Sequence, residues 1–343
     1  MGSVKDLVIL AAPTKKCPGQ GRFVFSDRYS IFDWGEMPDH IPQKGAALCI
    51  TAAYFFEKLE RGQISTHYLG LVEKEQVKSL SQLDQPVDIF ETRLYRVLSP
   101  EITNKNEYDY RIYQKEKGNY LIPLEIIYRN SLPQGSSIFK RLREGELRPE
   151  DLGLKNFPEK EITLEHPYLD VSTKLEASDR YLSWQEARQI SQLSEEKIEE
   201  IKKITLRVNN IISSEVQKIG LKNEDGKFEF ALAQNQEIVL VDVLGTMDEC
   251  RFTYQGMPVS KEIARLYYRK SEWYQEIIEA KKKDITHWKK FVKLNPQPLP
   301  PKLKQLISEL YKAFANEITG KEWFTKMPAF QDVLKEIKDF VEI

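Results

Sequence analysis

Three charged residues, Asp225, Lys227 and Glu229, alternate with apolar ones just before a short polar turn. Alternate side chains of a β-strand point to the same face, so these three are expected to share one surface. A second apolar run, Glu237 to Val243, follows the turn and carries Asp242. The two runs predict a hairpin in which Glu229 and Asp242 lie across from each other. Such a pair could share a Mg²⁺ ion, and the alternative is two solvent-facing acids on an edge strand.

A second candidate binding segment runs from Arg129 to Ser137. It combines an arginine with a Gly135-Ser136 turn, and three basic residues follow it. A guanidinium group can bind an oxyanion through two parallel hydrogen bonds, and a turn can present backbone N–H groups. The segment therefore favours a phosphate or carboxylate ligand. The alternative is an ordinary polar turn.

The elements that carry these residues change in character along the chain. Up to about Leu124, short strands and loops predict a mostly antiparallel sheet, whereas the second half mixes helical periods with the hairpin. A capping box at Ser183–Glu186 predicts a helix start, and Pro-rich residues 295–301 predict a stiff connector. The predicted strands are residues 4–10, 21–25, 87–97, 109–114, 120–128, 227–232 and 237–243, and the predicted helices are residues 46–59, 198–216, 260–292 and 303–318.

Composition excludes several classes of protein. The chain has 343 residues, and its 51 Lys and Arg against 52 Asp and Glu give a formal net charge of −1. This balance argues against a dedicated nucleic-acid binder, and no apolar run is long enough to cross a bilayer. Cys17, Cys49 and Cys250 are too few and too far apart for a disulfide framework or a zinc site. We expect a cytoplasmic protein without a structural metal that acts on small molecules, with a homo-oligomer left open.

Common nucleotide and hydrolase motifs are missing from the sequence. It has no P-loop, no dinucleotide fingerprint, no Gly-x-Ser-x-Gly elbow and no protein-kinase signature. If the protein is an enzyme, its site is therefore of a less common kind.

Seven segments, read in order, resemble the motifs of one enzyme family. They are Gly2–Leu7, Ser26–Asp33, Ile41–Gly45, Pro123–Ser136, Ser172–Asp179, Asp225–Phe230 and Asp242–Arg251. Together they are similar to SAICAR synthetase (phosphoribosylaminoimidazole-succinocarboxamide synthase). The resemblance implies an α+β or α/β fold of two lobes. An antiparallel-sheet N-terminal lobe similar to a kinase N-lobe would span residues 1–124, a mixed α/β lobe residues 125–294, and a helical extension residues 295–343.

The resemblance also implies an activity in de novo purine biosynthesis. The family uses ATP to join the carboxylate of CAIR, an aminoimidazole ribotide, to the amine of L-aspartate, giving SAICAR, ADP and phosphate through an acyl phosphate. ATP and Mg²⁺ would be the cofactors, and ATP, CAIR and L-aspartate the only partners implied. By resemblance, the catalytic residues would be Lys227, Arg129 and Asp225. ATP would bind Lys5, Gly2, Glu125 and Glu229, and the metal would bind Glu229 and Asp242. The substrates would bind Arg129, Ser136 (or Ser137), Arg251, Lys44, Asp33, Lys174 and Asp179.

Some positions depart from the family pattern, and two other functions stay open. Ser3 replaces a lysine, and Val243 replaces an acid beside Asp242. A small-molecule or lipid kinase could use the same ATP lobe, and it would turn over ATP without aspartate. An inactive nucleotide-binding or interaction protein, docking through residues 296–301, would show no turnover.

Overall fold

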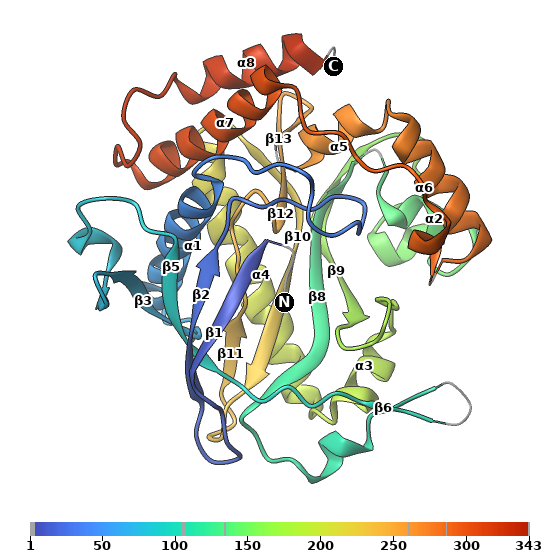
Figure 1. Ribbon diagram of the computed structural model, residues 1–343. Helices are drawn as coiled ribbons and strands as arrows, with labels where there is room; N and C mark the ends of the chain where they lie inside the picture. The colour runs from blue at the N-terminus through green and yellow to red at the C-terminus, as the bar shows by residue number, and fades with distance from the viewer. Residues whose placement is uncertain (1–3, 104–106, 134, 260, 286, 342–343) are drawn as a thin grey trace.

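Two antiparallel sheets form the framework of the protein (Figure 1). The computed structural model describes residues 4–103, 107–133, 135–259, 261–285 and 287–341. The first sheet has the order β1-β2-β5-β3-β4, and the second has the order β13-β12-β10-β8-β9, with β11 also paired to β10. The strands of the two sheets are β1 (Lys5–Ala11), β2 (Gly19–Phe25), β3 (Tyr68–Glu73), β4 (Gln76–Lys78), β5 (Ile89–Leu94), β8 (Tyr120–Leu132), β9 (Ile162–Thr173), β10 (Lys222–Leu232), β11 (Ile238–Val241), β12 (Cys250–Tyr254) and β13 (Met257–Val259). A separate small hairpin contains β6 (Glu101–Ile102) and β7 (Tyr108–Asp109).

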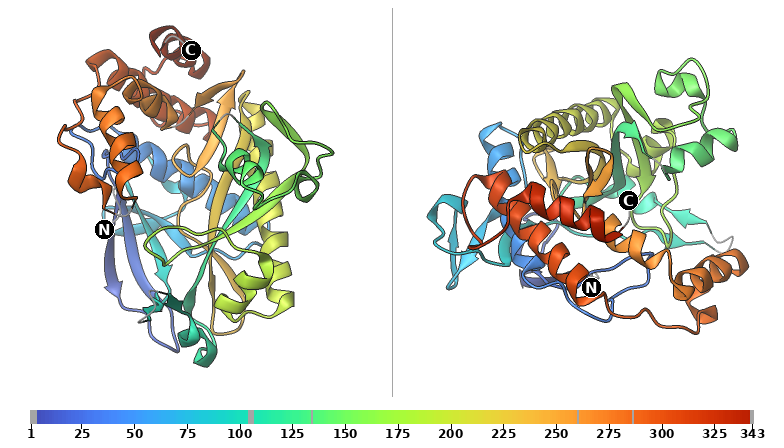
Figure 2. Two further views of the ribbon diagram at one scale, coloured as in Figure 1. Left: turned by 90° about the vertical axis from the view of Figure 1, so that its right-hand side faces the viewer. Right: turned by 90° about the horizontal axis from the view of Figure 1, so that it is seen from above.

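Helices pack against this framework. They are α1 (Lys44–Arg61), α2 (Ser137–Arg143), α3 (Trp184–Ser191), α4 (Glu195–Lys218), α5 (Glu262–Tyr268), α6 (Glu272–Lys283), α7 (Pro301–Thr319) and α8 (Phe330–Val341). Helix α4 packs on β8 and β10, and Figure 2 (left) shows it on the side of the second sheet away from β1. Helix α7 packs on α1, and α8 packs on α7. The other face of the second sheet is therefore the one that faces β1.

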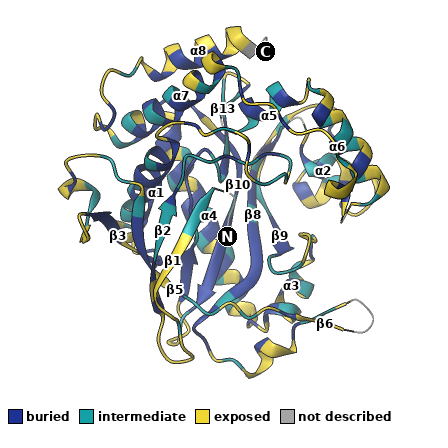
Figure 3. Cartoon of the chain, in the orientation of Figure 1, coloured by how far each residue is buried: buried dark blue, intermediate teal, exposed yellow. Residues whose placement is uncertain are grey.

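The strands at the centre and at the edge differ in burial. Strands β8 and β10 are almost wholly buried, whereas β1 is exposed from Leu7 onward (Figure 3). Phe228 and Phe230 of β10 enter the hydrophobic core, while the alternating charged residues of β10 occupy the opposite face. Burial of one face thus fixes which face of β10 can carry a polar site.

One hydrophobic cluster runs from α1 through the second sheet to α7 and α8. This core has no break at the limits that we predicted for the domains. Strand β8 begins at Tyr120, so the predicted limit at Leu124 falls within a strand, and the predicted C-terminal extension packs against α1 of the first half. The domain limits stay a prediction. No helix in the described part of the chain combines the length and the apolar character that a bilayer crossing requires.

Some sequence-based elements are confirmed and others are wrong. The hairpin of β10 and β11, the long strand β8 and helices α1, α4 and α7 lie where the sequence predicted them, within a few residues. The strand predicted at residues 109–114 is wrong beyond Asp109, where β7 ends: Asp109 accepts a hydrogen bond from the Arg111 backbone (2.9 Å), and a 3₁₀ turn, Arg111–Lys115, follows. Residues 260–292 are not one helix, because α5 ends at Tyr268 and Ser271 caps the start of α6, accepting from the backbone of Tyr274 at 3.2 Å.

A candidate active site across the central strands

The register of three strands brings the predicted site residues into one band. On β10 and β8, Asp225 pairs with Arg129, and Glu229 pairs with Glu125. On the other side of β10, Asp225 pairs with Arg251 of β12. Residues that are a hundred positions apart in the sequence therefore lie next to each other. Along β10 the band has two ends, about 13 Å apart for four residues at ~3.3 Å each.

We call the first part the carboxylate end: Glu125, Lys174, Lys227, Glu229 and Asp242. Glu125 and Glu229 are both buried and directly opposite each other, an arrangement that is unfavourable for like charges. Two lysines offset it. Lys227 Nζ lies 2.7 Å from Glu125 Oε1, and Lys174 bonds Glu229 while lying 3.3 Å from the same Glu125 oxygen.

Asp242 lies just beyond β11 rather than directly across from Glu229. Glu229 pairs with Val241, so the register predicted from the hairpin is wrong by one residue. Asp242 has a left-handed backbone (φ 63°), which turns the chain out of the strand, and its carboxylate bonds Lys5 of β1. Its carbonyl accepts a hydrogen bond from Nε2 of His67, 2.9 Å away, since a carbonyl can only accept. Lys5 and His67 thus tie the first sheet to this end of the site.

The two metal candidates have opposite pKa shifts. Burial, together with the negative charge of Asp242, raises the pKa of Glu229 to about 8. Burial acts in the same direction on Asp242, but the positive charge of Lys5 outweighs it and lowers the pKa of Asp242 to about 2. Burial and mutual repulsion thus disfavour two ionised carboxylates at once, and an additional cation would relieve this repulsion.

We call the second part the arginine end: Arg129, Asp170, Tyr181, Asp225 and Arg251. Arg129 is 3% exposed, and its guanidinium lies 3.4 Å from Asp170 and 3.6 Å from Asp225. The Tyr181 hydroxyl lies 3.1 Å from the same guanidinium. Nε of Arg251 lies 3.0 Å from the other oxygen of Asp225. Arg129 is therefore held by several partners, and Arg251 is held by one buried acid.

A further layer supports Arg129. Arg141 of α2 lies 2.5 Å from Asp170, and its guanidinium stacks on the Tyr181 ring at 4.0 Å from the centroid. Ser137 lies between the hydroxyl of Tyr181 (2.9 Å) and Arg129 (3.4 Å). Asp170 is thus shared by two arginines, and Tyr181 contacts both of them.

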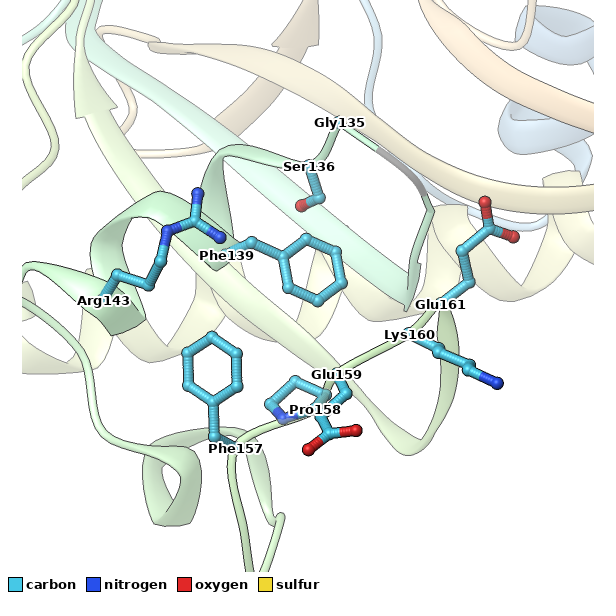
Figure 4. A pocket seen from close by; sticks show the side chains of 9 residues that line it. All are labelled: Gly135, Ser136, Phe139, Arg143, Phe157, Pro158, Glu159, Lys160 and Glu161. Atoms are coloured by element: carbon cyan, nitrogen blue, oxygen red, sulfur yellow. The ribbon is translucent and has the colours of Figure 1, made fainter.

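Ser136 does not face this band of residues. Its hydroxyl caps α2, accepting from the backbone of Ile138 at 3.4 Å, and its side chain lines a separate cavity of about 680 Å³. Figure 4 shows Ser136 in that cavity with Phe139, Phe157 and Arg143. Of the two serines left open by the sequence, Ser137 is therefore the one in contact with the arginine end.

A cavity of about 490 Å³ opens over the band. Its lining includes Glu125, Arg129, Ser137, Ser172, Asp179, Tyr181, Asp225, Lys227, Asp248, Glu249, Arg251, Lys261 and Arg265. Two buried atoms of these side chains, Nε of Arg129 and Oδ2 of Asp225, make no hydrogen bond in the described structure. Buried polar atoms are normally paired, so these two are placed to receive hydrogen-bond partners from a ligand.

The remaining predicted residues lie at different distances from this cavity. Asp179 lines it, and burial together with the charge of Glu125 raises the pKa of its carboxyl. Asp33 is 85% exposed and pairs with Lys281 of α6 at 3.1 Å. Lys44 is 1% exposed and pairs with Asp248 at 2.6 Å, so it does not reach the cavity surface. Gly2 lies outside the described residues.

Sequence reasoning missed four residues around the site: His67, Asp170, Tyr181 and Asp248. Asp170 belongs to β9, which was not predicted because Pro167 interrupts the strand pattern. One signal was available, since an acid flanked by Leu169 and Val171 in an apolar run is unusual unless it is paired. Tyr181 and His67 carry no comparable signal, because each meets the site only through long-range pairing.

The donor set fits a magnesium ion that also binds a substrate. The described residues contain no group of three or more His, Cys, Asp or Glu side chains arranged around a single metal position. Glu229 and Asp242 supply two buried carboxylates close enough to influence each other's charge. Mg²⁺ usually takes one or two carboxylates and fills its octahedron with waters and substrate phosphates. Two carboxylates would therefore be enough for an ion that also binds substrate phosphates.

Comparisons with known proteins point to one enzyme family. The family model described as SAICAR synthetase matches residues 13–281. A protein of Archaeoglobus fulgidus, provisionally named a phosphoribosylaminoimidazole-succinocarboxamide synthase, is 50% identical over 342 residues, covering 100% of both chains. The phosphoribosylaminoimidazole-succinocarboxamide synthase of Thermoplasma acidophilum is 32% identical, covering 88% of this chain and 93% of its own.

Solved structures show the same fold. The SAICAR synthase of Saccharomyces cerevisiae, complexed with SAICAR, aligns with a TM-score of 0.65 at 19% identity and covers 94% of both chains. A SAICAR synthetase in complex with ADP aligns with a TM-score of 0.55 at 20% identity, covering 87% of this chain and 99% of its own. The predicted family and fold class are thus confirmed, and the chain belongs to the SAICAR synthetase family.

Proposed function

We propose that this protein is the ATP-dependent ligase that joins CAIR to L-aspartate, forming SAICAR, ADP and phosphate in purine biosynthesis. The observation that carries the assignment is the pairing, on one face of β10, of an anion-binding arginine end with a carboxylate end reached by Lys5. A reaction that unites three anionic substrates needs this combination of positive charge and a cation site.

The arginine end is suited to the ribotide. Arg129 and Arg251 offer guanidinium groups that fit a phosphate or carboxylate, and Lys261 and Arg265 add positive charge to the cavity wall. The unbonded Nε of Arg129 would donate to the anion, and the unbonded oxygen of Asp225 would accept from a ligand N–H or O–H group. Ser137 would add a further hydroxyl. The carboxylate of CAIR would then point along β10 toward Lys227.

The nucleotide is proposed to lie beneath β1. Lys5, Leu7 and Ile9 alternate along this strand and so share one face, and the two aliphatic side chains are about half exposed. This gives a charged group for the phosphates and an apolar surface for the purine ring. Glu125 and Glu229 lie beyond Lys5 on the facing sheet.

The chemistry follows from the poor reactivity of a carboxylate. An oxygen of the CAIR carboxylate attacks the γ-phosphorus of ATP, and ADP leaves, so the carboxylate becomes an acyl phosphate. The amine of L-aspartate then attacks the acyl carbon and expels phosphate. Lys227 and Lys174 would shift from Glu125 and Glu229 to the substrate oxygens, whose charge they neutralise. Asp179, with its raised pKa, is suited to accept the proton that the amine loses.

Magnesium is part of the proposal. Mg²⁺ held by Glu229 and Asp242 would neutralise charge on the β- and γ-phosphates. With the cation in place, Lys5 and Lys174 would be free to contact phosphate oxygens instead of these two carboxylates.

The test measures ADP release and SAICAR formation with ATP, Mg²⁺ and CAIR, with and without L-aspartate. Product that requires all the substrates supports the ligase. ADP release that does not need aspartate, with a phosphorylated product, would instead identify a small-molecule kinase. No turnover under any of these conditions would favour a nucleotide-binding protein without this activity.

A further inference from the structure

One loop connects the two ends of the site. Residues 242–249, between β11 and β12, begin at Asp242 and end two residues before Arg251. Met247, Asp248 and Glu249 line the cavity. The path of the loop is fixed near its middle at Gly245, which has a left-handed φ of 71° and no room for a side chain against the Phe55 ring of α1.

Asp248 anchors this loop through both of its oxygens. Oδ2 accepts from Lys44 Nζ at 2.6 Å, and Oδ1 accepts from the hydroxyl of Tyr311 at 2.6 Å. All three side chains are buried, and the Lys44 ammonium also lies 5.4 Å from the centre of the Tyr311 ring. Burial acts to raise the pKa of Asp248, but the charges of Lys44 and Lys261 and the two hydrogen bonds lower it, so the group is ionised.

Tyr311 belongs to a part of the chain that the family model does not match. That match ends at residue 281, whereas α7 begins at Pro301. Helix α7 nevertheless contacts the site region at two further points. The Ser308 hydroxyl donates to the carbonyl of Pro42 at 2.7 Å, just before α1, and Phe314 stacks on Phe252, the residue after Arg251, at 5.8 Å.

We propose that Tyr311 is a positioning residue of the ligation reaction. Its hydroxyl, together with Lys44, fixes Asp248 and hence the loop that presents Arg251 to the ribotide. The proposal rests on the function proposed above. It gives the C-terminal helices a role in catalysis at a distance, and it assigns Lys44 to the support of Asp248 rather than to direct contact with a substrate.

A merely structural α7 would behave differently. It would add stability through its apolar face, and the loss of one hydroxyl would lower the melting temperature without changing any one substrate preferentially. A positioning Tyr311 acts on one loop, so its loss affects the substrate that Arg251 binds more than it affects ATP.

The experiment uses Tyr311→Phe in the full-length protein, which keeps the buried ring. We expect the KM for CAIR to rise by about three- to tenfold, as for one lost hydrogen bond, with the KM for ATP unchanged. Hydrogen exchange of the Glu249 and Cys250 amides, which bond the carbonyl of Thr246 at 3.2 and 2.9 Å, should become faster. This second readout does not depend on turnover, so an inactive wild-type enzyme would overturn the proposed function without hiding the effect on the loop.

Ser308→Ala is the matched control, because it removes the hydrogen bond that α7 makes to Pro42 and leaves Asp248 intact. It should leave the KM for CAIR and the loop exchange at wild-type values. If both variants raise the KM equally, or if Tyr311→Phe changes only the melting temperature, the positioning role is wrong. Asp248→Asn tests the same contact from the other side, should Tyr311→Phe not fold, and a wild-type KM for CAIR in that variant would also overturn the proposal.

Discussion

The two ends of the site lie on the same strands, but Arg129 and Lys227, one cation from each end, are held in different ways. At the arginine end, Arg129 is 3% exposed and has three partners, Asp170, Asp225 and Tyr181. At the carboxylate end, the cations are lysines on flexible stems, and Lys227 has a side chain that is 38% exposed and a single acidic partner, Glu125, within 4 Å among the described residues.

This difference matches two tasks. A guanidinium held by several groups is rigid and binds an anion in one orientation, whereas an ammonium is a mobile point charge that can change partners. The arginine end can therefore anchor a substrate that does not move during the reaction. The lysines of the carboxylate end can follow a phosphoryl group from ATP to the acyl phosphate.

Glu229→Gln should have the largest effect, because it removes one of the two proposed metal carboxylates without changing the shape of the side chain. We expect kcat to fall by about 10²–10³-fold, the range for losing an electrostatic group at the reacting centre. Initial rates measured against Mg²⁺ concentration check this. Glu224→Gln is the control, since this buried acid of β10 bonds Ser131 and Thr253 and is not one of the proposed metal carboxylates. Normal Mg²⁺ dependence in Glu229→Gln would remove the metal assignment.

Arg129→Ala should weaken CAIR binding by about 1.5–3 kcal/mol, the value for hydrogen bonds to a charged group. Arg129→Lys should be nearly as harmful, because a lysine cannot satisfy Asp170 and Asp225 together. Calorimetric titration with CAIR measures both. Arg143→Ala, which changes a basic residue of the separate cavity in Figure 4, should bind normally. A fully active Arg129→Lys would mean that rigidity is not what distinguishes the two ends.

Tyr181→Phe tests the support of the arginine end. The variant keeps the ring that stacks on Arg141 and loses the hydroxyl that contacts Arg129 and Ser137. The dissociation constant of CAIR should rise by about two- to tenfold, in keeping with one hydrogen bond. Equal affinity in Tyr181→Phe and wild type would show that Asp170 alone orients the arginine.

Glu215 lies outside the site, and we expect its replacement to have a smaller effect than the changes described above. It lies 2.8 Å from Lys58 and 2.7 Å from Lys218 and accepts from Tyr54 at 2.7 Å. Burial acts to raise its pKa, but these contacts outweigh it and lower the pKa from 4.5 to about 2. The unfolded chain thus takes up a proton at higher pH than the folded one, so this stabilisation is complete above about pH 4.5 and is lost as the pH falls toward 2. Urea unfolding between pH 6 and 3 should show a weaker pH dependence in Glu215→Gln, and identical slopes would contradict this.

The sequence predicted which residues form the two ends of the site better than it predicted the contacts that hold these residues in place. Alternation on β10 placed Asp225, Lys227 and Glu229 on one face, because a strand with one buried face has only one solution. The offset of Asp242 could not be predicted, since it depends on a left-handed backbone after β11. Asp170 and Tyr181 reach Arg129 through the pairing of β8 with β9, a contact between distant segments that no local pattern reports.

The helices show the same limit. The period of α7 predicted its extent, because a stripe of apolar residues must be buried wherever the helix packs. Nothing in that period shows that α1 is its partner or that Tyr311 meets Asp248. Helix α8 lies within the predicted helical extension, but its own bounds were not predicted. Local sequence therefore indicates which elements form, while their neighbours depend on the complementarity of whole surfaces.

The exposed edge of β1 has a consequence for self-association. Leu7, Val8, Ile9 and Leu10 are four consecutive aliphatic residues, each 46–59% exposed, on a strand at the end of its sheet. A strand edge of this kind can pair with the same edge of a second molecule and start aggregation. A nucleotide beneath β1 would cover Leu7 and Ile9 and leave less apolar surface open to such pairing. ADP should therefore reduce aggregation in concentrated solutions of the protein, in addition to being a product of the reaction.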